Sequence, residues 1–309
     1  MLKELKVSIL GGAGTLGATT AFVLAQQNLV DEISLIDLKE NIAASHKMDM
    51  EQAAAEFSSV EITSGDFSLL QASDIIINTV GIPEKQVQSR MDYLEGNYKI
   101  IQQISSHINQ YTKNPIIISA TNPLDIIHTL LQDLVAIPKK RMIGFSLNDT
   151  FRFRWALSKV LQEPIENIEA FVFGEHGEDQ IPIFSRIYIN QKQIQLAEEQ
   201  KQLVIQIIRN WFSDYQSLNS GRTSGWLSSI NLVKIIKAIV EDTKEIIPSS
   251  VIGKDGISIG QAARIGKNGV EAIEEIPLTL EETEEFNRVK QKINEQVKLI
   301  HEGITLHKS

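Results

Sequence analysis

Short apolar runs alternate with longer amphipathic segments through the first 145 residues of the chain. Several runs lack a regular polar alternation, which is typical of parallel strands buried on both faces. The expected strands are residues 6–10, 33–37, 61–63, 74–80, 115–119 and 142–145, and the expected helices between them are residues 15–27, 42–57, 93–111 and 124–134. This order predicts an α/β fold with a doubly wound parallel sheet.

The pattern changes near residue 146, where long helices begin to alternate with short, glycine-containing strands. The expected helices are residues 150–161, 197–215, 223–241 and 280–301, and the clearest expected strands are residues 249–252 and 257–259. We therefore predict two domains, a parallel α/β domain over residues 1–145 and an α+β domain over residues 146–309.

Composition limits the classes of function. The 309 residues are 42% hydrophobic and 22% charged, which is usual for a folded globular protein. The net charge of -9 disfavours nucleic acid as a partner, because phosphates require a basic surface. The absence of cysteine excludes disulfides, thiolate metal ligands and a cysteine nucleophile. With no cleavable apolar leader and no apolar stretch of the roughly 18 residues that span a membrane, the chain is expected to be cytoplasmic.

A glycine-rich turn, G-A-G-T-L-G at residues 12–17, joins the first expected strand to the first expected helix. Glycines there permit a tight turn and a close approach of backbone to a pyrophosphate. Asp37 ends the second expected strand, where its carboxylate can bind ribose hydroxyls and repel a 2′-phosphate. The pattern favours NAD over NADP; the alternatives are a merely glycine-rich turn and a turn or helix-capping role for Asp37. The expected dinucleotide contacts are Gly12, Gly14, Leu16, Gly17 and Asp37.

One histidine, His176, lies in the segment G-E-H-G at residues 174–177. Two glycines this close together disfavour a helix interior and predict a turn. A histidine exposed in a turn suits proton transfer, because its unperturbed pKa of about 6.5 is close to neutral pH. A lone histidine is more often a surface residue or a hydrogen-bonded core residue, so the case for catalysis by His176 depends on the residues that accompany it. Candidate partners are Asp149 and Arg152, which stand together upstream, and Arg90 in a polar segment.

Five spaced segments resemble the lactate/malate dehydrogenase family, and the resemblance covers nearly the whole chain. They are N-T-V-G at residues 78–81, Q-S-R-M-D-Y at 88–93, T-N-P-L-D at 121–125, D-T-F-R-F-R at 149–154 and G-E-H-G at 174–177. Phe151 replaces the family's alanine, and the chain is one residue shorter before Asp149. The resemblance implies a Rossmann-type NAD-binding domain followed by a catalytic domain, no metal, and a homodimer or homotetramer.

The resemblance also implies a role for each candidate residue in converting an L-2-hydroxy acid into its 2-oxo acid. His176 is expected to exchange the hydroxyl proton and Asp149 to orient its ring. Arg152 is expected to bind the substrate carboxylate bidentately, and Arg90 to polarise the carbonyl from a closing loop. The remaining expected substrate contacts are Asn122, Glu84 and Thr223, and the remaining expected cofactor contacts are Gly81, Asn97 and Asn122.

The segment before Arg90 departs from the family pattern. Glu84 stands where lactate dehydrogenases carry glutamine and malate dehydrogenases carry arginine, and the usual K-P-G becomes K-Q-V at residues 85–87. A carboxylate there would repel the second carboxylate of oxaloacetate, which favours a lactate-like or pyruvate-like monocarboxylate. Two alternatives remain, a malate dehydrogenase with a rearranged specificity loop and a catalytically silent NAD-binding interaction protein. A related family of NAD-dependent glycosidases uses a metal held by cysteine and histidine, and the absence of cysteine argues against it.

Overall fold

The computed structural model describes residues 4–82, 93–220 and 224–302. Its first half contains six parallel strands in the spatial order β3-β2-β1-β4-β5-β6, the order of a doubly wound dinucleotide-binding sheet. The strands are β1 (Lys6–Leu10), β2 (Glu32–Ile36), β3 (Glu61–Gly65), β4 (Ile75–Asn78), β5 (Ile116–Ser119) and β6 (Met142–Gly144). The predicted α/β class and the doubly wound parallel sheet are confirmed.

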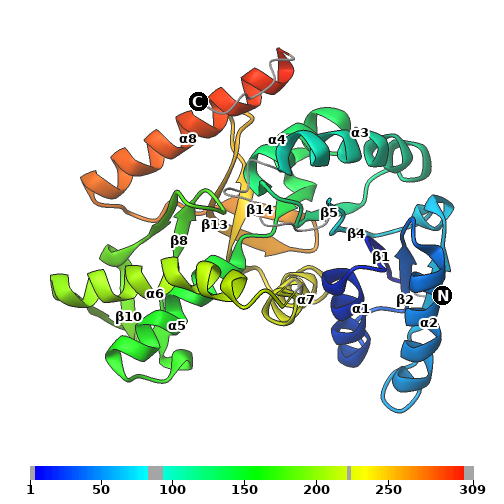
Figure 1. The fold of residues 1–309 in the computed structure, drawn as a ribbon, viewed down its shortest axis with the longest axis horizontal. Helices are drawn as coiled ribbons and strands as arrows, with labels where there is room; N and C mark the ends of the chain where they lie inside the picture. The colour runs from blue at the N-terminus through cyan, green and yellow to red at the C-terminus, as the bar shows by residue number, and fades with distance from the viewer. Residues whose placement is uncertain (1–3, 83–92, 221–223, 303–309) are drawn as a thin grey trace.

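Both faces of this sheet are covered by helices, which explains the apolar strands. Within β4, Ile75 and Ile77 join one core cluster while Ile76 joins another. The first cluster includes side chains of α1 (Thr15–Gln27) and α2 (Glu40–Ala54), and the second includes side chains of α3 (Leu94–Tyr111) and α4 (Leu124–Leu134). In Figure 1 the helices α1 and α2 lie at the right, on the far side of the molecule from α5 and α6.

The second half extends the same sheet with antiparallel strands. β6 pairs with β12 (Glu245–Ile252), followed by β13 (Ser258–Gly266), β8 (Val172–Gly174) and β9 (Gln180–Pro182), while β14 (Gly269–Ile273) also pairs with β13. A separate sheet contains β7 (Ile168–Glu169), β10 (Ile187–Ile189) and β11 (Lys192–Ile194). One continuous sheet thus crosses residue 145, and the domain division proposed there remains a prediction.

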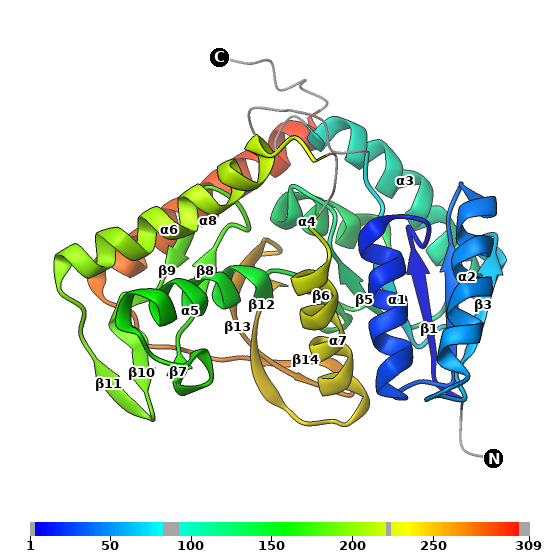
Figure 2. The same ribbon diagram turned by 60° about the horizontal axis from the view of Figure 1, so that its bottom comes forward.

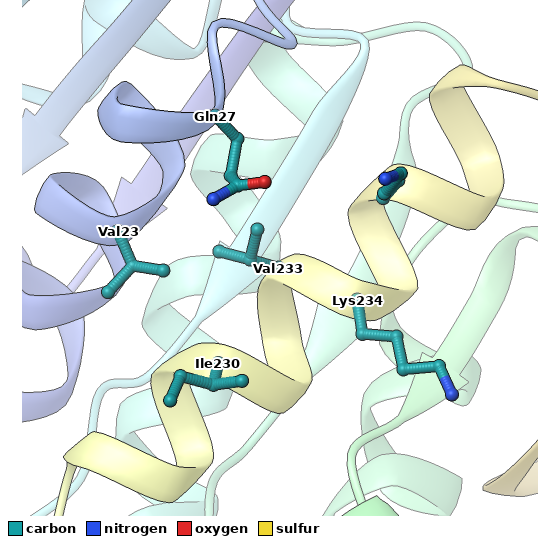
Figure 3. A pocket seen from close by; sticks show the side chains of 6 residues that line it. Val23, Gln27, Ile230, Val233 and Lys234 are labelled. Carbon is teal, nitrogen blue, oxygen red and sulfur yellow. The ribbon is translucent and has the colours of Figure 1, made fainter. Parts of the chain in front are cut away.

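Four long helices complete the described part of the second half, and Figure 2 shows α6 and α8 beside the strands β8 and β9. They are α5 (Leu147–Leu161), α6 (Glu198–Ser217), α7 (Trp226–Val240) and α8 (Leu280–His301). α7 packs against α1 and joins the first core cluster, and Figure 3 shows side chains of these two helices opposite each other. α8 packs on α4 and begins with a capping box between Thr279 and Glu282, which satisfies backbone N–H groups at its start.

Three predicted helices have the observed bounds, namely α1, α4 and α8. α5 begins at Leu147 rather than at Thr150, so Asp149 lies inside its first turn and does not cap it. β12 and β13 are longer than predicted because they pair with each other along their lengths. β7 to β11 are strands of two or three residues, too short for alternation of side chains to mark them.

Candidate active site

His176 lies in the turn between β8 and β9, which begins with a backbone conformation that favours glycine. Gly174 has φ +85°, and a Cβ atom there would lie 2.7 Å from the carbonyl oxygen of Asp179. The backbone N–H of His176 donates to Asp125 Oδ2 over 2.7 Å. Glycine therefore permits the backbone conformation at the start of the turn, and a contact with α4 holds the centre of the turn.

The ring of His176 contacts Asp149, which the first turn of α5 presents. His176 Nδ1 lies 2.6 Å from Asp149 Oδ2, and the two side chains are only 11% and 7% exposed. Because an ionised carboxylate can only accept hydrogen bonds, this contact places a hydrogen on Nδ1. The neutral ring then carries its lone pair on Nε2, which is the atom suited to take up a proton.

Arg152 lies one helical turn after Asp149 on the same face of α5. Its Nη1 is 3.8 Å from Asp149 Oδ1, and its guanidinium carbon lies 4.0 Å from the centre of the Trp211 ring on α6. Trp211 in turn stacks on Tyr215, with ring centres 5.4 Å apart. The guanidinium thus lies over the indole ring in a cation–π contact, which limits the positions that the planar fork can take when it binds a carboxylate.

Asp125 is a buried carboxyl between α4 and the His176 turn. Its exposed fraction is 1%, and Ser250 of β12 donates a hydrogen bond to its Oδ1 atom. Burial, the largest cause, and the nearby charges of Glu175 and Asp149 together raise the pKa of Asp125 to about 7, against the hydrogen bonds from Ser250 and His176. The sequence identified Asp125 only as part of a family signature and gave it no role.

The glycine-rich turn forms a cradle that side chains would fill. A Cβ atom on Gly17 would overlap the carbonyl oxygen of Gly11, one on Gly12 would lie 2.9 Å from Leu35 Cβ, and one on Gly14 would lie 3.2 Å from the Gly11 oxygen. Leu16, also expected to contact the dinucleotide, is half-buried at the start of α1 and packs against the first core cluster. The turn thus keeps the backbone bare at the N-terminus of α1, as phosphate binding requires.

Asp37 lies directly after β2, beside this cradle. Its Oδ2 atom accepts the backbone N–H of Ala13 over 3.0 Å, and its Oδ1 atom accepts the N–H of Lys39 over 2.9 Å. The turn role considered as an alternative is therefore present, together with a contact to the glycine-rich turn. A carboxylate has further lone pairs, so both contacts leave acceptor capacity for ribose hydroxyls.

Unpartnered polar atoms lie at the carboxyl ends of β4 and β5, the edge at which doubly wound sheets bind ligands. Asn78 Nδ2, Ser119 Oγ and Asn122 Oδ1 are buried and have no hydrogen-bond partner in the described part of the chain. The bare glycine cradle, the carboxylate of Asp37 and these unpartnered atoms together fit a bound dinucleotide.

Asn97 connects this edge of the sheet to α3. Its Nδ2 donates to the carbonyl oxygen of Asn122 over 2.6 Å, and its Oδ1 accepts the N–H of Ile82 over 2.8 Å. Gly81 lies alongside, and a Cβ atom there would be 3.4 Å from Asn97 Oδ1. The predicted cofactor contacts Gly81, Asn97 and Asn122 are therefore brought together, with Asn97 fixing the loop that carries Asn122.

Three predicted substrate contacts, Glu84, Arg90 and Thr223, lie outside the described residues. Sequence reasoning missed Trp211 and Ser250. No spacing signal links Trp211 on α6 to Arg152 on α5, and Ser250 belongs to a strand that looks wholly structural.

Other features of the described residues offer no competing chemistry. Among them, no group of three or more histidine or acidic side chains is placed to hold a metal ion, and no described helix has the length and apolarity to cross a membrane. A hollow between α1 and α7 is lined by apolar, amide and lysine side chains (Figure 3), without the acid and base pair found at His176. Its lining residues are Val23, Gln27, Ile230, Val233, Lys234 and Lys237.

The chain matches two family models, the lactate/malate dehydrogenase NAD binding domain over residues 5–144 and the lactate/malate dehydrogenase alpha/beta C-terminal domain over residues 147–303. The malate dehydrogenase of Chlorobium limicola is 32% identical over 294 residues, which cover 92% of this chain and 94% of that protein. The L-lactate dehydrogenase of Clostridium perfringens is 30% identical over 297 residues, which cover 91% and 93%. The lactate dehydrogenase of Cryptosporidium parvum, solved with lactic acid and NAD, superposes with a TM-score of 0.90 at 26% identity and covers 97% of this chain and 99% of its own.

Proposed function

The chain belongs to the lactate/malate dehydrogenase family, and we propose that it interconverts a small L-2-hydroxy acid and its 2-oxo acid, preferring a lactate-like or pyruvate-like monocarboxylate. Residues 5–144 form the family's NAD-binding domain, and the cofactor is NAD. The observation that carries the proposal is the 2.6 Å contact between His176 Nδ1 and Asp149 Oδ2.

The His176 and Asp149 pair suits exchange of the substrate's hydroxyl proton. With Nδ1–H donated to Asp149, Nε2 takes the proton when the alcohol is oxidised and returns it when the oxo acid is reduced. The Asp149 carboxylate stabilises the imidazolium formed in the first direction. NAD, when bound, supplies the hydride-transfer half of the reaction. The protein residues need only hold the substrate and move this one proton.

Arg152 suits the substrate carboxylate. Its fork lies one helical turn from Asp149 and is held against Trp211, so a carboxylate bound there places the adjacent carbon near the His176 ring. Arg90 and Asn122 are assigned to the substrate oxygen, and Thr223 to the substrate pocket, as proposals from the family resemblance. The preference for NAD over NADP is likewise a proposal, supported by the place of Asp37 beside the glycine-rich turn.

The choice between monocarboxylate and malate rests on Glu84. Two like charges about 4 Å apart at an effective dielectric constant near 20 repel by about 4 kcal/mol. If Glu84 faces the substrate, oxaloacetate is disfavoured relative to pyruvate. A malate dehydrogenase with a rearranged loop is the second candidate, and it is favoured by relatives such as the malate dehydrogenase of Chlorobium limicola. A homodimer or homotetramer and a cytoplasmic location remain predictions.

Oxidation of NADH with a panel of 2-oxo acids tests the proposal. We expect turnover with pyruvate or a bulkier monocarboxylate at a kcat/KM several powers of ten above that with oxaloacetate. A preference for oxaloacetate supports the malate alternative. NADH binding without turnover on any 2-oxo acid supports a silent NAD-binding protein and contradicts both dehydrogenase proposals.

A Glu84→Arg variant separates the two substrate proposals. If Glu84 faces the substrate, the variant gains oxaloacetate turnover and loses pyruvate turnover. Lys85→Gln is the matched control, because it tests whether the neighbouring lysine, rather than Glu84, interacts with the substrate's side chain. A loss of oxaloacetate turnover in Lys85→Gln, with no gain in Glu84→Arg, assigns that role to Lys85.

A further inference from the structure

Asp125 is a buried carboxyl that the proton exchange described above does not use. Its Oδ2 accepts the N–H of His176 over 2.7 Å, and its Oδ1 accepts the hydroxyl of Ser250. Ser250 Oγ lies 2.7 Å from Ser258 Oγ on the neighbouring strand β13. One side chain of α4 thus connects the His176 turn to the β12 and β13 strands.

The start of α4 is also fixed on its other side, toward the cofactor. The carbonyl oxygen of Asn122 accepts Asn97 Nδ2 over 2.6 Å, and Thr121 Oγ1 donates to the carbonyl oxygen of Val80 over 2.6 Å. Asp125 follows Asn122 by three residues. Its contact with His176 therefore joins the turn that carries the proton-exchanging ring to the segment that carries Asn122.

The ring contact alone does not fix this turn. Asp149 holds Nδ1, but His176 is followed by Gly177, whose backbone has more conformational freedom than that of any other residue. A turn that moves by about 1 Å can slow a reaction about 100-fold, because the reacting atoms must stay aligned. A second contact on the backbone removes this freedom.

We propose that Asp125 is the positioning residue of His176: it holds the backbone of His176 while Asp149 holds the ring, and it sets the distance from the ring to the Asn122 segment. The proposal rests on the proposed function, in which His176 exchanges the substrate proton. It assigns Asp125 no contact with substrate or cofactor.

The charge of Asp125 acts on the same ring. Among the described residues, the charged groups that act on Asp125 are Asp149 from α5 and Glu175 from the His176 turn, both acidic. When Asp125 is ionised, it adds a further negative charge beside the imidazole and favours its protonated form. Replacing the carboxyl with an amide keeps the acceptor for the His176 N–H but removes this charge.

Three variants separate position from charge. Asp125→Asn keeps the hydrogen bond and removes the charge, Asp125→Ala removes both, and Asp133→Asn is the control on the same helix. Asp133 is 52% exposed and pairs with His301 over 3.3 Å, and it follows Asp125 by eight residues, about 12 Å along the helix. The measurements are single-turnover oxidation of NADH with pyruvate and with oxaloacetate, NADH affinity by fluorescence titration, and NMR titration of the histidine rings, with His176 assigned through His176→Asn.

We expect Asp125→Ala to slow the single turnover by about 10-fold to 100-fold with NADH affinity within about twofold of wild type. Asp125→Asn is expected to recover turnover to within about fivefold of wild type, and to move the titration midpoint of His176 to lower pH. Asp133→Asn is expected to change none of these quantities.

Two results overturn the proposal: a folded Asp125→Ala variant with near wild-type turnover, or equal losses in Asp125→Ala and Asp125→Asn. Should Asp125→Ala fail to fold, an unchanged His176 midpoint in Asp125→Asn also overturns it. If wild type oxidises NADH with neither oxo acid, the proposed function fails, while the NMR titration still tests the contact between Asp125 and His176.

Discussion

The two ends of the site are built by opposite means. At the nucleotide end, Gly12, Gly14 and Gly17 leave the backbone bare, and the shape depends on side chains that are absent. At the proton end, the His176 ring contacts Asp149 across 27 residues of chain, and the His176 backbone N–H contacts the Asp125 side chain across 51 residues. The nucleotide end should therefore be damaged by added atoms, and the proton end by removed ones.

The largest effect is expected at the proton end, from His176→Asn. Asparagine keeps a polar side chain but has no group that exchanges a proton near neutral pH, so kcat should fall about 100-fold or more. NADH affinity should stay nearly unchanged, because His176 follows β8, which lies six strands away from β1 and the glycine cradle in the sheet. Steady-state kinetics and NADH fluorescence titration measure the two quantities, and near wild-type turnover would remove His176 from its assigned role.

A somewhat smaller effect is expected from Arg152→Lys. Lysine keeps the charge but loses the bidentate fork and the contact of the guanidinium with the Trp211 ring. The KM for the oxo acid should therefore rise about 10-fold to 100-fold, with a smaller change in kcat.

Trp211→Leu should raise the same KM by about fivefold, because the Arg152 guanidinium loses its cation–π partner.

Trp155 provides the matched control for Trp211. It lies 5.7 Å from Lys159 Nζ and is 39% exposed, so Trp155→Leu removes a comparable aromatic and cation pair from the surface. Equal KM values for the Trp211 and Trp155 variants would show that the stacking does not position Arg152. An unchanged KM in Arg152→Lys would remove Arg152 from the carboxylate site.

At the nucleotide end, the addition of one carbon in Gly17→Ala should weaken NADH binding by about tenfold or more. The new Cβ atom would overlap the Gly11 carbonyl oxygen and force the turn or α1 to shift. Gly65→Ala is the control, since a Cβ atom there lies 3.2 Å from the flexible Leu69 side chain. Calorimetric titration with NADH measures both. Equal affinities in the two variants would contradict the cradle.

The smallest effect is a pH-dependent change in stability at the proton end. Burial raises the folded-state pKa of Asp125 to about 7, above its unfolded value of about 3.9. Between these values the unfolded chain has released a proton that the folded protein keeps, so this group's contribution to stability falls as pH rises through that window.

Asp125→Asn does not titrate, so its Tm relative to wild type should increase between pH 5 and pH 8, by roughly 2–5 °C. Thermal unfolding at several pH values measures this difference. Asp133→Asn should show a much smaller trend, because it removes only an exposed pair with His301. A flat or falling difference for Asp125→Asn would show that the buried carboxyl does not act as described.

The comparison of the two ends also explains what the sequence could predict. The glycine cradle lies within six consecutive residues, and helices such as α1 and α4 follow from local periodicity and from turns at their ends. The pairing of His176 with Asp149 was expected from a resemblance to a family, since no spacing rule places a residue of α5 beside the β8 and β9 turn.

Other parts of the site depend on tertiary structure alone. Ser250 contacts Asp125 across 125 residues, and Trp211 covers Arg152 only because α6 packs on α5. The short strands β7 to β11 form because other strands lie beside them and pair with them. Each has only two or three residues, too few for an alternation of apolar and polar side chains to predict a strand. Such contacts become visible only when the chain is folded.

The continuous sheet has a consequence for the order of events on the ribosome. β6 pairs with β12, and α1 packs on α7, although about 100 and 200 residues separate these partners along the chain. At about 5–20 residues per second, β6 emerges roughly 5–20 s before β12, and α1 roughly 10–40 s before α7. During that interval the edge of β6 and the apolar face of α1 lack these partners, and an unpaired strand edge beside an apolar helix face is the kind of surface through which nascent chains aggregate.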